Sequence, residues 1–567
     1  MTDNTSLVNR AVERIFAERK DFIIIGLTGR TGCGCSTVAR LLQKSFVDLQ
    51  PPLPHDNKTI EDREYKIIYE YARNTWIPFR LIEMKHIIFT FILEHAYEEM
   101  FQYVNKCSGS VIDFSNYEET YKALHKKRVE LKQKVEERAN HLENILAADD
   151  LYSFYFEEIP KAFAEFQKHI PVEVYTILLQ KIGDNIRASG DAFSENVVPE
   201  NVLKLSQRVN MLIKILRQRN IQEKKQVLVV IDAFRNPYEA TFFKDRYSAF
   251  YLFAINSLDN ERKNRLIKKG FTYDDVVKLD KKEYPSLNNE IGVFNNINIE
   301  KTVEKADVHI NNPDSKSNIY DETKRQLIRY VSLIMHPGLV PPTQIEYCMQ
   351  SAYNARLNSG CLSRQVGAVI SDSQYSIIAT GWNTTPAGQI PCSLRSLFSL
   401  IHDDEEDEVG MSEYERTDEK YRNYVKNKTQ DIDFSLLKGR NCSYCFKDAY
   451  LSYKNQKNQV HTRAIHAEEM AFLQAAKIGT PVVTGGYLFT TASPCELCSK
   501  KAYHLGISKI YYIDKYPGIS YEHILNCGES SLDMIPFSGA IGRAYTQLYT
   551  EILPYKDELY MLLGLKF

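Results

Sequence analysis

Compact apolar runs punctuate the first half of the chain. The runs are Asp21–Gly26, Gln226–Asp232, Ala249–Ile255 and Asp307–Ile310. Continuous apolar runs of this kind are typical of strands buried on both faces of a parallel sheet. Long stretches with helical spacing separate them, so we predict a doubly wound α/β domain over residues 1–325.

A highly charged segment lies between the first two runs. Residues 116–165 are rich in Lys, Glu, Arg, Leu and Tyr at helical spacing. The charge pattern predicts a long solvent-facing helix within a helical insertion over about 116–220. A helical hairpin or a surface for self-association is the alternative interpretation.

Turn-forming residues mark the end of the first domain. The segments NNPDSKS and HPGLVPP fall within residues 311–342, and we place a linker at 326–342. Helical and strand patterns then alternate through residues 343–567, which predicts a second α/β domain. The expected elements are helix 344–358, strands 366–371 and 376–382, helix 465–477, strand 486–491, helix 495–505 and strand 509–513.

A polar stretch from about 395 to 440 interrupts this second pattern. It includes the acidic run DDEEDE at 403–408. No spacing there places carboxylates around one point, so we interpret the stretch as a solvated insertion rather than a metal site.

Composition narrows the class of protein. Of 567 residues, 44% are hydrophobic and 25% charged, with a net charge of −2, so no overall basic field recruits nucleic acid. No apolar run reaches the roughly 18 residues of a membrane span, and the first residues lack the apolar core of a signal peptide. We therefore expect a cytoplasmic protein with no membrane partner, whose eleven cysteines bind metal or are buried rather than form disulfides.

The strongest chemical signal lies in two short segments. His466-Ala467-Glu468 and Pro494-Cys495-Glu496-Leu497-Cys498 match the H-x-E and P-C-x-x-C signature of zinc nucleobase deaminases. Cys495 and Cys498 are three residues apart at a predicted helix start, so both thiolates face the same way. With His466 they offer three ligands to Zn²⁺ and leave a fourth tetrahedral position open, as in catalytic sites.

Glu468 is the predicted catalytic residue. Zinc can lower the pKa of a bound water from about 16 to near 7. Glu468 would carry the proton of that water to the ring nitrogen N3 and later to the leaving amine. A structural zinc site is the alternative, but it leaves Glu468 and the proline before Cys495 without a role.

Five ordered segments around these residues resemble the deoxycytidylate deaminase family, which has the cytidine deaminase fold. They are CLSRQVGAVISD (361–372), GWNTTPAG (381–388), IHAEEMA (465–471), TTASPCELCSKKA (490–502) and ISKIYYIDKY (507–516). The resemblance covers about residues 343–548. It implies a three-layer α/β/α domain that converts deoxycytidine nucleotides to deoxyuridine nucleotides.

The resemblance also implies substrate contacts. Asn383 is expected to contact the deoxyribose and Tyr516 to lie near the pyrimidine, while Trp382 and Thr384 depart from the family's usual Tyr and Gly. Asn383 could equally be a turn residue, because Asn-Thr-Thr-Pro favours turns. The candidate phosphate-binding cations near the matched segments are Arg364, Arg463, Lys500 and Lys501, which leaves monophosphate and triphosphate substrates open.

Further cysteines in this domain suggest a second, structural zinc, as some relatives in the family carry. Cys442-Ser-Tyr-Cys445 has a spacing that chelates zinc well. The hypothetical ligands are Cys392, Cys442, Cys445 and either His461 or Cys361. The alternative is a set of free cysteines.

A glycine-rich segment follows the first apolar run. Gly29, Gly32 and Gly34, followed by Cys35, Ser36 and Thr37, fit the P-loop pattern except that Cys35 replaces the lysine. Such a turn can cradle an anion with backbone N–H groups, although it lacks the charge that steadies phosphoryl transfer. Asp232 ends the second apolar run, where a Mg²⁺-organising carboxylate is expected.

The N-terminal half resembles the nucleoside monophosphate kinase branch of P-loop proteins. Supporting segments are RNPYEA at 235–240, the cation-rich ERKNRLIKKG at 261–270 and ADVHINN at 306–312. A nucleotide-binding regulatory module is the preferred interpretation. An active kinase and a structural remnant are the alternatives.

The pairing of the two domains resembles bacterial P-loop–deaminase fusions that act in antiviral defence by depleting deoxycytidine nucleotides. This resemblance implies deamination of dCTP, dCMP or both, held in check until infection. Because oligomers are common in the deaminase family, we also expect a homo-oligomer, with a nucleotide effector such as dTTP and an RNA or protein inhibitor as further partners. A polynucleotide cytosine deaminase, or a nucleotide kinase or signalling switch, are the rival hypotheses.

Overall fold

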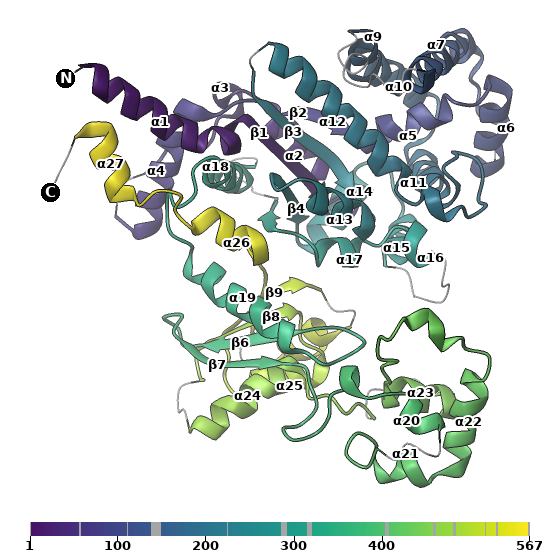
Figure 1. Ribbon diagram of the computed structural model, residues 1–567, viewed down its shortest axis with the longest axis vertical. Coiled ribbons are helices and arrows are strands. Elements are labelled where there is room, and N and C mark those ends of the chain that lie inside the picture. The colour runs from purple at the N-terminus through teal and green to yellow at the C-terminus, as the bar shows by residue number, and fades with distance from the viewer. Residues whose placement is uncertain are drawn as a thin grey trace. The chain divides into compact units, whose positions relative to one another are not determined.

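The computed structural model divides the chain into two compact units (Figure 1). Unit 1 comprises Met1–Pro341 and Ser538–Phe567, and unit 2 comprises Pro342–Phe537. The structure describes residues 2–55, 58–109, 111–137, 149–223, 225–284, 292–314, 320–402, 407–456, 461–479, 483–515, 518–528 and 531–564. None of the described helices is both long enough and apolar enough to cross a membrane.

The described strands of unit 1 form one sheet in the order β11-β5-β4-β1-β3-β2. All neighbours are parallel except β11, which runs antiparallel to β5. The four predicted strands are confirmed, with ends shifted by at most two residues, whereas β2 and β11 were too short to stand out. The strands are β1 (Phe22–Thr28), β2 (Arg80–Glu83), β3 (Val227–Phe234), β4 (Phe250–Asn256), β5 (Val308–Asn311) and β11 (Gly539–Ala540).

Helices cover both faces of this sheet. They are α1 (Thr2–Asp21), α2 (Cys35–Leu42), α3 (Phe46–Leu49), α4 (Ile60–Thr75), α5 (Met84–Ile92), α6 (Tyr97–Ser108), α7 (Glu118–Glu137), α9 (Asp149–Ser153), α10 (Ile159–Lys168), α11 (Val172–Ser189), α12 (Lys204–Gln222), α13 (Pro237–Arg246), α14 (Asp259–Ile267), α15 (Tyr273–Glu283), α16 (Gly292–Asn295), α17 (Ile299–Val303), α18 (Asp321–Met335), α26 (Gly542–Tyr549) and α27 (Tyr555–Leu563). Along β1, Ile23 and Ile25 join a core with α2, α4 and α18, while Ile24 joins a second core with α5, α11 and α12. This alternation explains the continuous apolar runs, because successive residues of a strand face opposite sides.

The helical insertion differs from the predicted solvent-facing helix. Tyr121, Leu124 and Leu131 of α7 are buried, and the Tyr121 hydroxyl donates to the Ile92 carbonyl at 2.8 Å. Arg128 of the same stripe is also buried and donates to Glu94 at 2.6 Å. Buried residues three, four and seven positions apart form one face of a helix, and the many charges around them concealed that face in the sequence. Residues 138–148 of the segment lie outside the described residues.

The boundary between the units also differs from the predicted one. Residues 326–335 of the expected linker belong to α18, whose Leu327 and Val331 are buried in unit 1. The last segment of the chain, expected in the second domain, instead adds β11, α26 and α27 to unit 1, where Ala544 and Leu548 are buried. Pairing of β11 with β5 requires a contact between distant parts of the chain, which local periodicity does not reveal.

The described strands of unit 2 form a mixed sheet in the order β10-β9-β8-β6-β7. They are β6 (Gly367–Ser371), β7 (Ile377–Trp382), β8 (Tyr487–Ala492), β9 (Lys509–Asp514) and β10 (Asp533–Pro536). The helices are α19 (Gln344–Ala355), α20 (Phe398–Ile401), α21 (Glu413–Thr417), α22 (Glu419–Thr429), α23 (Phe446–Lys454), α24 (Ala467–Ile478) and α25 (Glu496–His504). The sheet lies between α19 on one face and α24 with α25 on the other, as the predicted three-layer arrangement requires (Figure 1).

The polar stretch predicted as a solvated insertion has a core of its own. Residues 392–456 carry α20 to α23, and Leu400, Tyr421 and Tyr444 are buried together among them. Arg395 and Glu415 form an ion pair in which both side chains are fully buried. We call residues 392–456 the lobe. Residues 403–406 of its acidic run lie outside the described part of the chain.

Candidate active site

Two helix N-termini of unit 2 present the predicted metal ligands. His466 immediately precedes α24, and Cys495 immediately precedes α25, three residues after β8 ends at Ala492. Cys498 lies in the first turn of α25, so its sulfur is on the same side as that of Cys495. The N-termini of the two helices are held close together for two reasons. Strands β8 and β9 pair in parallel, and α24 and α25 pack on the same face of the sheet.

The ligand atoms have the spacing of a tetrahedral zinc site. The Nδ1 of His466 lies 3.4 Å from the sulfur of Cys495 and 3.5 Å from that of Cys498, and all three atoms fall within 4.8 Å of one another. Zn–N and Zn–S bonds of typical length at a tetrahedral angle place N and S about 3.6 Å apart. The donor set therefore fits Zn²⁺ and provides three protein ligands.

Electrostatics also suit a cation. A hydrogen bond from the Cys498 thiol, with a further one from His466, lowers the pKa of Cys495 to about 4. The pKa of Cys498 is raised, because it holds the proton shared with Cys495 and because it is buried. One proton shared by two sulfurs is the arrangement that a metal ion displaces on binding.

Glu468 lies beside this cluster in the first turn of α24. Its side chain is only 4% exposed, and the Thr490 hydroxyl lies 3.2 Å from its Oε1. Burial raises the pKa of the Glu468 carboxyl. Both features are typical of a carboxyl group that takes up and releases a proton.

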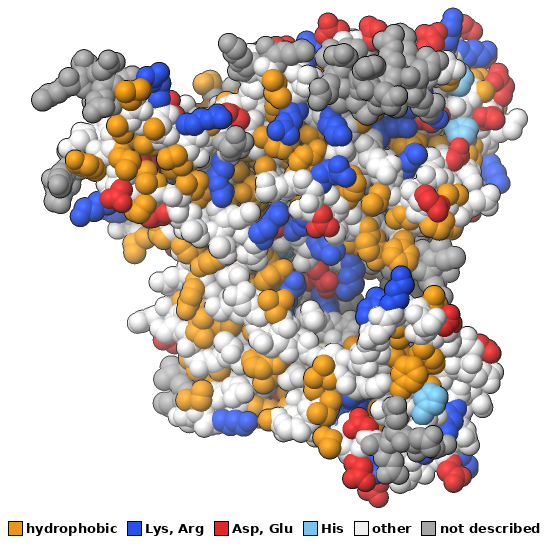
Figure 2. All heavy atoms as spheres, viewed as in Figure 1, with side chains coloured by type: hydrophobic (Ala, Val, Ile, Leu, Met, Phe, Trp, Pro, Cys, Tyr) orange, Lys and Arg blue, Asp and Glu red, His pale blue; other side chains and the backbone are white. Residues whose placement is uncertain are grey.

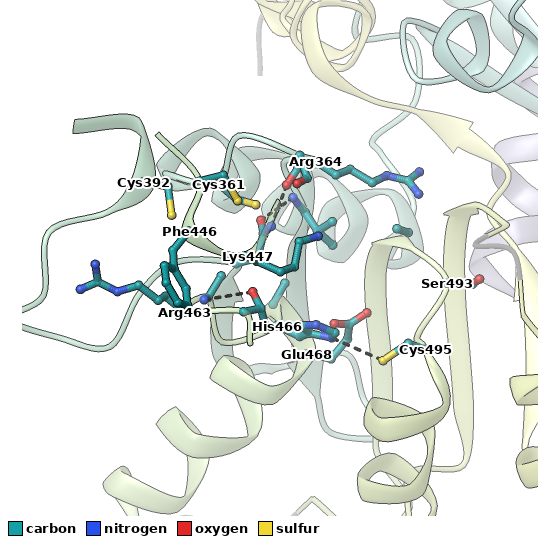
Figure 3. Close-up of a pocket in the computed structure, with 18 residues that line it drawn as sticks. Cys361, Arg364, Cys392, Phe446, Lys447, Arg463, His466, Glu468, Ser493 and Cys495 are labelled. Carbon is teal, nitrogen blue, oxygen red and sulfur yellow. Dashed lines mark hydrogen bonds between the residues drawn. The ribbon is translucent and has the colours of Figure 1, made fainter. Parts of the chain in front are cut away.

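A cavity of about 170 Å³ opens beside these groups (Figure 3). Its lining residues are Cys361, Ser363, Arg364, Val366, Asn383, Cys392, Cys445, Phe446, Lys447, Thr462, Arg463, Ala464, His466, Ala467, Glu468, Ala492, Ser493 and Cys495. The cavity is therefore bounded by the metal cluster, by the segment 361–372 that resembles the family, by Asn383 and by the lobe.

Gly381 brings α24 close to the sheet. A Cβ at this position of β7 would lie 2.2 Å from the Ala467 carbonyl oxygen and 2.5 Å from the Ala471 nitrogen. Only glycine therefore allows the start of α24, with His466 and Glu468, to approach β7 this closely.

Replacing Gly381 with Ala is expected to lower the catalytic activity of this site by about 10²-fold, because a shift of α24 by a few tenths of an ångström or more misplaces Glu468. Steady-state kinetics and zinc content measure the effect. Thr380→Ala, at the exposed neighbouring position, is the control and should retain activity. Full activity in Gly381→Ala would contradict this role of the close approach.

Comparisons with known proteins agree with the site. The family model for the cytidine and deoxycytidylate deaminase zinc-binding region matches residues 438–514. The deoxycytidylate deaminase of Enterobacteria phage T4 is 30% identical over 173 residues, which cover 30% of this chain and 76% of that protein. The chain belongs to the deoxycytidylate deaminase family. It is thus a hydrolytic deaminase of cytosine nucleotides.

Two further proteins are similar to part of this chain. The deoxycytidylate deaminase of Enterobacteria phage T2 is 29% identical over 173 residues, covering 30% of this chain and 78% of that protein. A crystal structure of the dCMP deaminase from the cyanophage S-TIM5 in apo form shares 22% identity, with a TM-score of 0.21, and the match covers 35% of this chain and all of that one.

The Asn383 side chain is hydrogen-bonded through both its oxygen and its nitrogen. Its Oδ1 accepts hydrogen bonds from the Ser359 hydroxyl and the Val366 N–H, both at 2.7 Å, and its Nδ2 donates to the Arg364 carbonyl at 2.6 Å. It lines the cavity while holding the 359–366 loop in place. Trp382 is not among the described residues that line the cavity, because adjacent strand positions face opposite sides of the sheet. Tyr516 lies outside the described residues.

The four candidate phosphate-binding cations are placed differently from one another. Arg364 forms an ion pair with Asp514, and Lys501 forms one with Glu469. Arg463 donates to the Gly410 carbonyl of the lobe at 3.0 Å, and Figure 3 shows it extending away from His466 and Glu468. Lys500 is exposed, and neither it nor Lys501 is among the described residues lining the cavity.

Lys447 was missed in the sequence. It lies in the first turn of α23, lines the cavity, and pairs with the adjacent Asp448 at 3.2 Å. Its side chain is only 16% exposed. Nothing in the pattern around it marked a site, because the lobe places it there through tertiary packing.

The cysteines proposed for a second zinc are only partly brought together. Cys392 and Cys445 hydrogen-bond to each other, and both line the cavity with Cys361. Cys442 and His461 complete the five candidates, and all five are among the described residues. No three of them place ligand atoms within 4.8 Å of one another in this structure, and the second zinc site stays a prediction.

In unit 1, the glycine-rich turn connects β1 to α2 as predicted. Gly29, Gly32 and Gly34 have φ angles of 153°, 95° and 105°, which favour glycine. Ser36 hydrogen-bonds to Asp232 across the carboxyl ends of β1 and β3. Residues 34–37, with Cys35 and Thr37, form the start of α2.

The turn lacks a cation at the lysine position. Burial raises the pKa of the Cys35 thiol well above its usual range, so this side chain carries no charge there. Arg30 does not supply the missing charge, because it forms ion pairs with Asp259 at 2.9 Å and Asp280 at 2.8 Å.

Proposed function

We propose that unit 2 converts deoxycytidine nucleotides to deoxyuridine nucleotides, with His466, Cys495 and Cys498 as ligands of one Zn²⁺ and Glu468 as the proton carrier. The observation that carries the proposal is a nitrogen and two sulfurs at tetrahedral spacing beside a buried carboxyl group. Membership of the deoxycytidylate deaminase family supports the reaction class.

When bound, zinc acts as a Lewis acid that makes water a nucleophile at neutral pH. Glu468 removes a proton from that water and delivers it to N3 of the cytosine ring. It then carries the remaining hydroxyl proton to the amino group, so that the C4–N bond breaks, ammonia leaves and the oxygen of the water stays on C4 as a carbonyl. Thr490 orients the carboxyl, while Asn383 fixes the loop that bounds the base side of the cavity.

Lys447 is the residue that we propose for the phosphate end of the substrate. The other candidate cations already have partners: a carboxylate for Arg364 and Lys501, and a backbone carbonyl for Arg463. Lys447 instead projects from the lobe into the cavity, and among the contacts described it pairs only with Asp448 on its own helix. A phosphate can compete with the exposed Asp448 for that ammonium group.

Lys447→Ala is expected to raise the KM for dCMP about tenfold and to leave kcat within about twofold, because a phosphate contact far from the reacting atoms stabilises ground and transition states alike. Lys500→Ala, at an exposed lysine outside the cavity, is the matched control. Equal KM values in the two variants would assign the phosphate to other groups.

The test of substrate is an assay of dCMP and dCTP side by side, with and without dTTP. Preference for dCTP would support the proposed depletion of that nucleotide in phage defence, and a response to dTTP would support feedback by an effector. Loss of protection against phage in a Glu468→Ala strain would tie the cellular role to deamination.

The charge of the lobe that borders the cavity supports a free nucleotide as substrate better than a polynucleotide. Glu408, Glu413 and Glu419 of the lobe are exposed, and Figure 2 shows acidic side chains on its outer surface. Such side chains repel a phosphate backbone. Incubation with single-stranded DNA and RNA followed by sequencing distinguishes the two substrates.

For unit 1 we propose a regulatory nucleotide-binding role rather than phosphoryl transfer. The hydrogen-bonded Ser36 and Asp232 provide oxygen ligands suited to Mg²⁺, and the glycine turn offers N–H groups to a phosphate. The uncharged Cys35 and the paired Arg30 leave the turn without the cation that steadies phosphoryl transfer.

A further inference from the structure

The carbonyl side of the glycine turn in unit 1 is held by surrounding side chains. Arg262 donates to the Thr31 carbonyl at 3.0 Å, and Arg265 donates to the Cys33 carbonyl at 3.3 Å. The Asn312 amide also donates to the Cys33 carbonyl, at 2.8 Å. With its carbonyls bound from α14 and from the end of β5, the turn is fixed before any ligand arrives.

The N–H side of the same turn carries an internal anion. The Thr31 N–H lies 3.1 and 3.2 Å from the two carboxylate oxygens of Glu283, and the Thr31 hydroxyl donates to the same group. The Arg235 guanidinium donates to Glu283 at 2.7 Å. Glu283 is fully buried at the end of α15, and these hydrogen bonds compensate the cost of removing its carboxylate from water.

Other charges nearby do not explain this contact. Asp280, one turn earlier on α15, pairs with Arg30 and Arg262 at 2.8 Å each. Those two arginines are therefore neutralised without Glu283. The Glu283 carboxylate is directed instead to the donors of the turn, which are the groups that an anionic ligand would use.

A ligand-sized cavity adjoins these donors. It has a volume of about 490 Å³, and both Thr31 and Arg235 line it, together with Ser36 and Asp232. Lys85 and Lys269 add further positive charge to its wall. A phosphate-bearing molecule in this cavity would meet the Glu283 carboxylate at the Thr31 end of the turn.

We propose that Glu283 is an internal competitor for the phosphate seat of this turn, and that a phosphate-bearing ligand occupies the seat only when the carboxylate leaves Thr31 and Arg235. The inference rests on the regulatory nucleotide-binding role proposed above. Two anions cannot share one N–H and one guanidinium without strong repulsion in a buried site. Ligand binding is thereby linked to movement of the end of α15, since the ligand stabilises whichever conformation withdraws the carboxylate.

Glu283→Gln keeps the size of the side chain and removes its charge. Its affinity for inorganic tripolyphosphate with Mg²⁺, measured by isothermal titration calorimetry on the full chain, is expected to exceed that of the parent by at least about tenfold. The matched control is Asp274→Asn, which removes a charge from an exposed position of the same helix and should stay within about twofold of the parent.

Glu283→Asp is the second variant. It keeps the charge but shortens the side chain by one methylene, and an intermediate rise of at least about twofold is expected, because the hydrogen bonds to Thr31 are weakened. Differential scanning calorimetry of the same preparations reports whether unit 1, which contains Glu283, is folded in each variant. Should Glu283→Gln fail to fold, the Asp variant decides.

The two ways of failing are distinguishable. Equal affinity in the parent and both Glu283 variants overturns the competition and leaves phosphate binding by the turn in place. No heat of binding in any folded variant overturns both the competition and the nucleotide-binding role. Neither result bears on the zinc-dependent reaction of unit 2.

Discussion

Replacing Glu468 with Ala is expected to lower kcat for dCMP by at least about 10³-fold while the zinc content stays at one ion per chain. A positioned general acid–base group contributes about 10²- to 10⁴-fold, and Glu468 acts at each proton transfer of the proposed reaction. The metal is retained because the three ligand atoms are those of His466, Cys495 and Cys498. Steady-state kinetics and elemental analysis of the purified protein measure the two quantities.

The neighbouring glutamate is a matched control for this variant. Glu469 follows Glu468 on α24 but pairs with Lys501, and its side chain is 34% exposed. Glu469→Ala should therefore retain most of the activity. Turnover in Glu468→Ala equal to that of Glu469→Ala would contradict the proposed mechanism, whereas loss of zinc together with activity would show that Glu468 serves the metal site instead.

Local sequence patterns were sufficient for the parts of the molecule that depend on neighbouring residues. The buried run at Gln226–Asp232 becomes β3 because each of its faces packs on a different layer of helices. Cys495 and Cys498 meet at one side because three residues span one helical turn. In both cases the information lies within a few positions of the chain.

Contacts between distant segments could not be predicted in this way. Lys447 lines the cavity from the lobe, and the lobe also contains the buried Arg395–Glu415 ion pair between positions twenty residues apart. Glu283 reaches the glycine turn across 252 positions. From the sequence, charged residues of this kind are expected at the surface, because the neighbouring residues do not distinguish an exposed charge from one with a buried partner.

The C-terminal segment shows the same limit at the scale of a domain. Its short apolar pattern would suit either unit, but Ala540, Ala544 and Leu548 are buried beside β5 and α18. Arg543 donates to the Phe250 carbonyl of β4 at 2.8 Å, and the Gly338 N–H donates to the Leu548 carbonyl at 2.9 Å. The first unit is thus completed only when the last residues of the chain are in place.

Deletion of residues 538–567 is therefore expected to destabilise unit 1 by several kcal/mol and to leave the deaminase unit folded. The deletion removes the antiparallel partner of β5 and exposes the core that Leu548 fills. It also removes Glu558, whose carboxylate lies 3.0 Å from the buried His336 ring. Losing one buried leucine side chain alone costs about 2–5 kcal/mol.

Point variants give the same prediction without shortening the chain. Leu548 is fully buried, whereas Leu563 in the same segment is 63% exposed. Leu548→Ala is expected to lower the unfolding temperature of unit 1 by several degrees, and Leu563→Ala to leave it within about one degree, because only the former opens a cavity. Differential scanning calorimetry resolves the transitions, and dCMP deamination reports on unit 2. Equal melting of the two variants would mean that α26, which carries Leu548, is not part of the core of unit 1.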